Sequence, residues 1–174
     1  MSRLYEKEYS SIEKIEDKKG WWDMTREDFM ENTSKLTNSF KENAKYVEQF
    51  MLEAFDNHAE IKDMSHVIVP IESLKDINSE YYGLFISIYR EFIAVWIAID
   101  DGHGVRDGMS IGDYPLDLSF SELVNKCKND LDICPKCKRK VGLANMKQFS
   151  FAGRCCEKCL PEMRKEYEQP GWYN

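Results

Sequence analysis

The sequence predicts an α+β protein with N-terminal helices, a mainly antiparallel sheet and a small cysteine-rich segment at the C-terminal end. Apolar residues recur at helical spacing as far as about residue 54, and three short runs of strand character follow between residues 66 and 99. Two Cys-x-x-Cys pairs lie beyond residue 132. Helices that flank consecutive strands, without strict strand–helix alternation, are typical of α+β domains.

Two helical segments are expected before the strands. In the first, one helical face carries Leu4, Tyr5, Tyr9, Ile12 and Ile15. The second begins at Thr25, an N-cap residue with Asp28 three positions on, and its apolar stripe continues at helical spacing over residues 29–54. Asn38 and Ser39 can interrupt this stripe, so the pattern permits either one long helix or two.

Three strands are expected next. Residues 66–71 form a β-branched run, and residues 81–89 combine aromatic side chains with alternation. Residues 92–99 are apolar on both faces, which predicts the central strand of the sheet, covered on both sides. Residues 100–108, with the sequence DDGHGVRDG, are expected to form a loop because glycines and aspartates favour turns.

A further helix starts after Ser119, where Glu122 completes a capping box. Its expected buried face consists of Phe120, Leu123, Val124, Cys127 and Leu131. The chain is then expected to divide near Asp132. Residues 1–131 would form an acidic α+β domain, here called the acidic domain, and residues 132–174 a second unit, here called the cysteine segment.

Charge is distributed unevenly between these two parts. The cysteine segment contains nine Lys and Arg against five Asp and Glu, a balance of +4. The other 15 basic and 26 acidic residues give the acidic domain a balance of −11. We therefore expect nucleic acid to repel the acidic domain, whereas the cysteine segment can contact phosphate. The candidate contacts surround the first cysteine pair: Lys136, Lys138, Arg139 and Lys140.

The cysteine pattern predicts one structural zinc ion. Cys134 and Cys137 form one Cys-x-x-Cys turn, Cys156 and Cys159 form another, and the 18 residues between the pairs are enough for a β-hairpin. Each turn can aim two sulfurs at one centre, and zinc prefers four such ligands at tetrahedral corners. In a reducing compartment, clustered cysteines indicate metal binding rather than disulfides. Cys155 is assigned as a non-ligand because only Cys156 has the two-residue spacing to Cys159.

Residues 133–170 resemble a treble-clef zinc finger, in which a knuckle, CPKC here, and a hairpin precede a helix that brings the second ligand pair. The hairpin would run through VGLANMKQFSFAGR, and Pro161 suits the first turn of the helix. A zinc ribbon is the alternative, but it needs strand character where LPEMRKEYE looks helical. The resemblance implies a closed structural site, without which the segment unfolds.

Three functions are compatible with these features. The first hypothesis is a non-enzymatic interaction protein whose acidic domain binds a protein partner. It could act as an inhibitor or nucleic-acid mimic, as phage-encoded inhibitors of defence nucleases do, an analogy based on size and charge alone. The second is a regulator that grips DNA or RNA through the zinc-binding segment. The third is an enzyme that uses His103 in the loop of residues 100–108, although such a loop also needs its glycines and polar groups for conformation.

No membrane partner is expected from the sequence. The longest apolar run is residues 92–99, whereas a helix needs about 20 apolar residues to cross a bilayer. The N-terminal residues include acids where a secretion signal would have its apolar core. A cytoplasmic location is therefore the default expectation.

Overall fold

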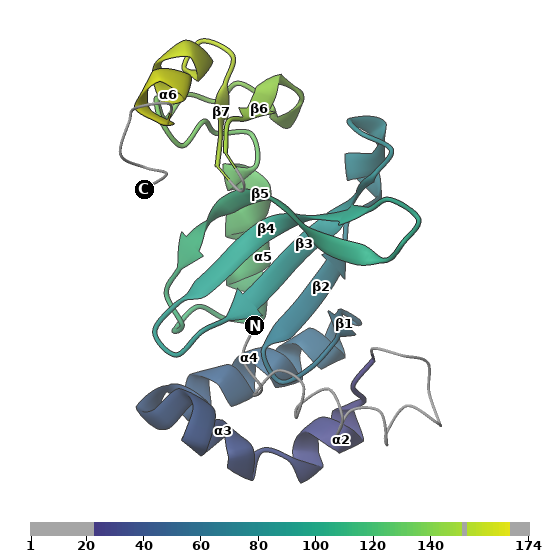
Figure 1. Cartoon of the computed structure of the whole chain (residues 1–174). Helices are drawn as coiled ribbons and strands as arrows, with labels where there is room; N and C mark the ends of the chain where they lie inside the picture. The colour runs from purple at the N-terminus through teal and green to yellow at the C-terminus, as the bar shows by residue number, and fades with distance from the viewer. Residues whose placement is uncertain (1–22, 151–152, 168–174) are drawn as a thin grey trace.

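The computed structural model describes residues 23–150 and 153–167, and it confirms the predicted α+β fold class (Figure 1). The first helices are α2 (Arg26–Glu31), α3 (Ser34–Phe40) and α4 (Ala44–Asp56), with a 3₁₀ turn at Lys41–Asn43. The sheet contains β1 (Glu60–Ile61), β2 (His66–Pro70), β3 (Tyr81–Ile88), β4 (Ile93–Asp100) and β5 (Val105–Tyr114), with a 3₁₀ turn at Glu72–Asp76. The rest comprises α5 (Phe120–Asp130), a 3₁₀ turn at Leu143–Asn145, β6 (Met146–Gln148), β7 (Arg154–Cys156) and α6 (Leu160–Tyr167). The helix expected over residues 4–15 lies outside the described residues.

The apolar stripe that follows Thr25 forms three α-helices rather than one or two. Thr25 caps α2 as predicted, because its Oγ1 accepts a hydrogen bond from the Asp28 N–H and the Asp28 carboxylate accepts one from the Thr25 N–H, both at 3.2 Å. Lys41 has a positive φ of 53°, which a regular helix cannot contain, and α3 ends there. This break falls after Asn38 and Ser39, which both lie within α3, and an earlier break at Asn32 and Thr33 separates α2 from α3.

Each strand of the sheet pairs antiparallel with its sequence neighbours, in the order β1-β2-β3-β4-β5. The residues expected to form the central strand, 92–99, largely form β4. This strand is interior and mostly buried on both faces, as expected, but the middle place belongs to β3. β4 is interior because β5, which the sequence pattern did not predict, pairs with its outer side, and β3 is in the middle because the strands follow one another in sequence order.

The loop expected over residues 100–108 is shorter than predicted. β4 includes residue 100 and β5 begins at Val105, so residues 101–104 alone connect the two strands. The N–H groups of Gly102 and His103 each donate to the aspartate two residues earlier. β5 lacks a clear apolar alternation because it has several exposed polar side chains and two register irregularities against β4.

Helices α4 and α5 contribute to one hydrophobic core with a single face of the sheet (Figure 1). The capping box of α5 is confirmed, since Ser119 Oγ accepts the Glu122 N–H at 3.2 Å, and the predicted apolar face is buried. Glu53 of α4 accepts the N–H groups of Phe120 at 3.0 Å and Ser121 at 3.1 Å, which ties the two helices together. The side chains that the sheet contributes to this core are Ile61, Val67, Leu84, Ile86, Ile88, Ile93, Val95, Ile97, Met109, Ile111 and Tyr114.

An ion pair at the start of β2 makes stability depend on pH. His66 Nδ1 lies 2.9 Å from both carboxylate oxygens of Asp63. Burial is the largest single influence and opposes both charges, but the hydrogen bond and the charge attraction between the two side chains, with smaller contributions from Ser65 and Asp107, together outweigh it. The pKa of His66 is therefore raised above its ordinary value, and the pKa of Asp63 is lowered.

Replacing His66 with Asn should therefore destabilise the protein, by less than about 1 kcal/mol because both side chains are partly exposed. The contribution of His66 is complete below its unfolded pKa of about 6.5 and is lost as pH rises through the higher folded pKa. At the acid end, it is lost as pH falls through the lowered pKa of Asp63. Melting temperatures from about pH 5 to about pH 9 should show the gap between wild type and His66→Asn closing at alkaline pH. A gap independent of pH would contradict this account.

Candidate metal centre

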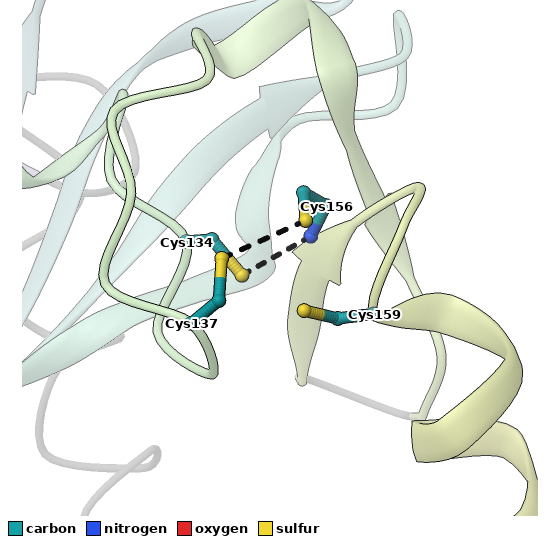
Figure 2. A group of neighbouring side chains, drawn as sticks. All are labelled: Cys134, Cys137, Cys156 and Cys159. Atoms are coloured by element: carbon teal, nitrogen blue, oxygen red, sulfur yellow. Dashed lines mark hydrogen bonds between the residues drawn. The ribbon is translucent and has the colours of Figure 1, made fainter.

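Four cysteine sulfurs converge at the C-terminal end of the structure (Figure 2). The Sγ atoms of Cys134, Cys137, Cys156 and Cys159 all lie within 4.8 Å of one another. Zinc–sulfur bonds of about 2.3 Å at tetrahedral angles separate the sulfurs by about 3.8 Å, and the Cys137–Cys156 sulfur distance is 3.9 Å. All four are free thiols. The cluster therefore has the dimensions of a four-sulfur metal site.

A tight turn after α5 presents the first pair, Cys134 and Cys137. The Cys134 N–H donates to the Arg139 carbonyl at 2.9 Å, and the Lys138 N–H donates to the Cys134 carbonyl at 2.9 Å. Lys138 has a positive φ of 63°, which reverses the chain directly after Cys137. An isolated β-bridge closes the base of the turn.

The second pair comes from a hairpin and a helix. β6 and β7 pair antiparallel, with Met146 opposite Cys156 at the end of β7. Cys159 immediately precedes α6, and its carbonyl accepts the N–H of Met163 at 3.0 Å. Pro161 lies in the first turn of this helix, so the segment has the expected order of turn, hairpin and helix.

The four thiols differ in acidity. Arg139 Nε donates to Cys137 Sγ at 3.4 Å, and chiefly this bond lowers the pKa of Cys137 to about 6. Burial, followed by hydrogen bonds with the other three cysteines, raises the pKa of Cys159 to about 12. Burial opposes the Cys134 thiolate, but hydrogen bonds from backbone N–H groups outweigh it and lower the pKa of Cys134 as well. The cluster thus favours thiolates at Cys134 and Cys137 but not at Cys159, because like charges repel at this separation. A divalent cation at the centre would remove that repulsion.

The other two cysteines lie outside the four-sulfur group. Cys155 is fully buried on β7, opposite Lys147, and its assignment as a non-ligand stays a prediction. Cys127 is fully buried on α5, where burial, first of all, raises its pKa to about 12. The structure thus brings together the four residues that the sequence proposed, and the binding of a metal by them stays a prediction.

A buried arginine joins the cysteine segment to the sheet. Arg154, the first residue of β7, is 3% exposed. Its guanidinium donates from Nε to the Ser110 carbonyl at 2.7 Å, from Nη1 to Leu131 at 3.0 Å and from Nη2 to Asp130 at 2.9 Å. Ser110 belongs to the edge strand β5, whereas Asp130 and Leu131 end α5. β7 therefore docks where the edge of the sheet meets the C-terminus of α5.

From the sequence alone, Arg154 is one of the nine basic residues of the cysteine segment. A weak signal was present, because side chains two residues apart on a strand share a face. A strand that directs Cys156 inward therefore directs Arg154 inward as well. The carbonyls that receive the guanidinium lie 23 to 44 residues earlier in the chain, and no local pattern identifies them.

The four basic residues proposed for nucleic-acid contact have different surroundings. Lys136 Nζ lies 3.2 and 3.7 Å from two carboxylates of α6. Arg139 donates to a sulfur of the cluster. Lys138 and Lys140 are exposed at the turn. The structure therefore uses two of the four cations within the cysteine segment itself.

His103 is exposed in the short turn between β4 and β5. Its backbone N–H donates to the Asp101 carboxylate at 3.1 Å, and its neighbours Gly102 and Gly104 have φ values of 91° and 114°. These positive angles suit glycine and shape the turn. Asp100, Asp101, Gly102 and Gly104 thus have conformational roles in this turn.

Comparison with known proteins gives no family assignment. No protein-family model matches the chain, and neither the curated proteins nor the solved structures contain a significant match. Across the residues described, no helix combines the length and apolar character needed to cross a membrane. The functional argument therefore depends on the contacts of this chain itself.

Elemental analysis of purified protein should find one zinc ion per chain. Replacing Cys134, Cys137, Cys156 or Cys159 with Ser should reduce the zinc content and unfold the cysteine segment, since structural zinc contributes on the order of 10 kcal/mol to such folds. Acidification should release the metal because protons compete for the thiolates. Cys155→Ala is the control and should retain the metal. Full zinc content in the four Ser variants would contradict the assignment.

Replacing Arg154 with Met should destabilise the protein by about 3 kcal/mol, because buried carbonyls lose charged donors. Arg154→Lys should recover part of this loss, since one ammonium group can reach some of the same acceptors. Arg164→Met changes an exposed arginine of α6 and serves as the control. Urea unfolding measures each variant. Equal stability of Arg154→Met and Arg164→Met would contradict the docking role.

Proposed function

We propose that this chain is a non-enzymatic zinc-binding protein in which a treble-clef zinc finger braces an acidic α+β domain, and that the acidic domain binds a protein partner. The observation that carries the proposal is the group of four sulfurs attached to the sheet edge through Arg154. An ion held by four protein ligands has no open position for water or substrate. Such an ion contributes to folding rather than to a reaction.

Zinc is the metal that this donor set favours. Four thiolates at tetrahedral spacing are typical of structural zinc, with iron–sulfur chemistry as the other common occupant of such sites. The helix at Leu160–Tyr167 supports a treble clef over a zinc ribbon, because a ribbon needs a strand in that place. Arg154 supports a brace, since it attaches the finger to the edge of the sheet.

The charge of the acidic domain supports a partner with a basic surface. A balance of −11 over residues 1–131 repels nucleic acid and attracts positively charged proteins. Proteins that handle nucleic acid present basic surfaces to phosphate. We therefore place the partner in that class, with the acidic domain as an inhibitor that occupies the basic surface.

A regulator that contacts nucleic acid through the finger is the second candidate. The exposed Lys138 and Lys140 favour it. The pairing of Lys136 with α6 and of Arg139 with the sulfur cluster weakens it, because those cations are already compensated. An enzyme based on His103 has less support, since the groups around His103 shape a turn.

Zero-length carbodiimide coupling in a lysate of the organism that encodes the chain tests the proposal, because this reagent joins carboxylates to lysines in contact. We expect the full chain to recover a protein partner at low salt, with crosslinks from carboxylates of the acidic domain to lysines of the partner. Moderate salt should prevent the coupling.

A gel-shift experiment with mixed DNA and RNA separates the two candidates. The proposal expects no shift at low salt. A shift that Lys138→Gln/Lys140→Gln abolishes would favour the regulator, provided that Lys35→Gln/Lys45→Gln, an equal charge change at exposed helical lysines, leaves it intact. That result together with no protein crosslink would overturn the proposed function.

A further inference from the structure

The face of the sheet opposite α4 and α5 has an aromatic row, and we call it the open face. Strand pairing places Ile68, Phe85, Trp96 and Ser110 directly opposite one another across β2, β3, β4 and β5. Side chains alternate between the faces of a strand, and the neighbours Leu84, Ile86, Val95 and Ile97 fill the helix-side core. The row therefore points away from that core. In Figure 1, α5 runs behind the sheet, so the open face is toward the viewer.

The aromatic side chains of the open face form a continuous edge-to-face series. The ring centroids of His66 and Phe85 are 6.0 Å apart, and those of Phe85 and Trp96 are 6.3 Å apart. All three side chains are partly exposed, and neither Phe85 nor Trp96 belongs to the core shared with the helices. The accessible part of the row consists of ring surface of these three side chains, because the residues between and beside them are buried: Ile68, Gly83, Ser87, Ala94 and Ala98.

Carboxylates border this apolar row on the β5 side. Asp107 pairs with Ala98 and Asp113 pairs with Ala94, so both aspartates share the open face, and both are exposed. The negative charge of Asp107 also acts on His66. His66 belongs to β2, whereas Ala98, which pairs with Asp107, belongs to β4. Among the influences on the pKa of His66, burial and Asp63 come first, and Asp107 adds to the upward shift.

A second acidic group lies at the end of the sheet, around Tyr82. The hydrogen bond from Tyr82 to Glu60 is the main reason that the pKa of Tyr82 is raised to about 12. Burial and the negative fields of Glu60, Asp100 and Asp23 add to the shift. Lys62 partly compensates this group, because its Nζ lies 3.0 Å from Asp23 and 3.8 Å from Glu60.

Positive charge is scarce beside the open face. Over strands β2 to β5, Arg106 is the single Lys or Arg, and it pairs with Ile99 on the opposite face. Its guanidinium also lies 3.5 Å from the carboxylate of Asp101. The open face thus combines aromatic rings with a surplus of carboxylates. A membrane with anionic lipids or a nucleic acid would be repelled by it.

We propose that the open face is the docking surface for an extended segment of a partner protein that carries Arg or Lys side chains between apolar ones. The inference rests on the proposed function and names the surface that performs it. The guanidinium or ammonium groups would lie on the faces of Trp96 and Phe85, where cation–π attraction applies. Their charges would be compensated by Asp107 and Asp113, and the apolar residues would cover the ring edges.

A peptide of about 12 residues that alternates Arg and Val is the probe, and its counterpart with Glu in place of Arg is the control. The indole N–H signal of Trp96, identified by loss of that signal in Trp96→Phe, reports contact by NMR. We expect the Arg peptide to shift this signal in a salt-sensitive manner and the Glu peptide to leave it unchanged. Equal effects of the two peptides, or none, would overturn the inference.

Charge variants localise the binding. Asp107→Asn/Asp113→Asn should raise the Kd of the Arg peptide on the order of fivefold, as expected for two exposed ion pairs. Glu27→Gln/Glu31→Gln removes the same charge from exposed positions on α2 and should leave the Kd nearly unchanged. Equal weakening by both pairs would mean that net charge alone attracts the peptide, which contradicts a docking surface.

Photo-crosslinking tests the other occupants of the open face. Benzoylphenylalanine in place of Phe85 should crosslink the Arg peptide, and mass spectrometry identifies the attached residues. Crosslinks to residues 1–22 of the same chain, without attachment of the peptide, would show that the chain itself covers the open face and would overturn the inference. The absence of any crosslink would do the same.

The inference and the proposed function fail in different ways. Crosslinks between a lysate partner and carboxylates elsewhere on the acidic domain would preserve the proposed function and reject the open face as its site. A nucleic-acid shift that depends on Lys138 and Lys140, with no protein partner, would reject the proposed function. In that case, contact between the Arg peptide and Trp96 would not correspond to a biological partner.

Discussion

The buried guanidinium of Arg154 holds the cysteine segment against the sheet and α5, with which that segment also shares the hydrophobic core. It donates to the carbonyls of Asp130 and Leu131 at the C-terminus of α5, where the helix dipole favours a positive charge. Its third bond reaches β5. Cys134 lies three residues after Leu131, and Cys156 lies two residues after Arg154. The sulfur cluster and the guanidinium therefore fix the same two segments of backbone, so metal-induced folding of one would constrain the other.

The two edges of the sheet are protected in different ways. An edge strand exposes unpaired backbone groups that invite pairing with other chains. β1 has two residues, and the Met24 N–H donates to the Ile61 carbonyl there at 2.8 Å. The longer β5 gives its Ser110 carbonyl to Arg154, which brings β7 against it. The cysteine segment therefore covers part of this edge of the sheet.

The features that the sequence predicted well are the ones that a few neighbouring residues determine. The helix caps at Thr25 and Ser119 span four positions each, and so do the cysteine turns. The features that it missed depend on distant partners or on an unusual backbone angle. Lys41 interrupts the helical stripe because its φ is positive, and a lysine gives no sequence signal for such a backbone angle. Arg154 finds acceptors far away in the chain, and β5 is an edge strand whose register shifts obscure its alternation.

Several of the basic residues of the cysteine segment contact groups within the protein and are not free to bind phosphate. The positive balance of the segment suggests a surface for phosphate, yet Arg154 is spent inside the protein, Lys136 faces carboxylates of α6 and Arg139 faces a sulfur. Folding places these cations beside carbonyls, carboxylates and a sulfur, which they compensate. In the described part of the acidic domain, carboxylates such as Glu53 and Asp63 have internal partners, whereas Asp107 and Asp113 are exposed on β5. Their charge lies at the surface, and it supports the proposal of a basic protein as the partner rather than a nucleic acid.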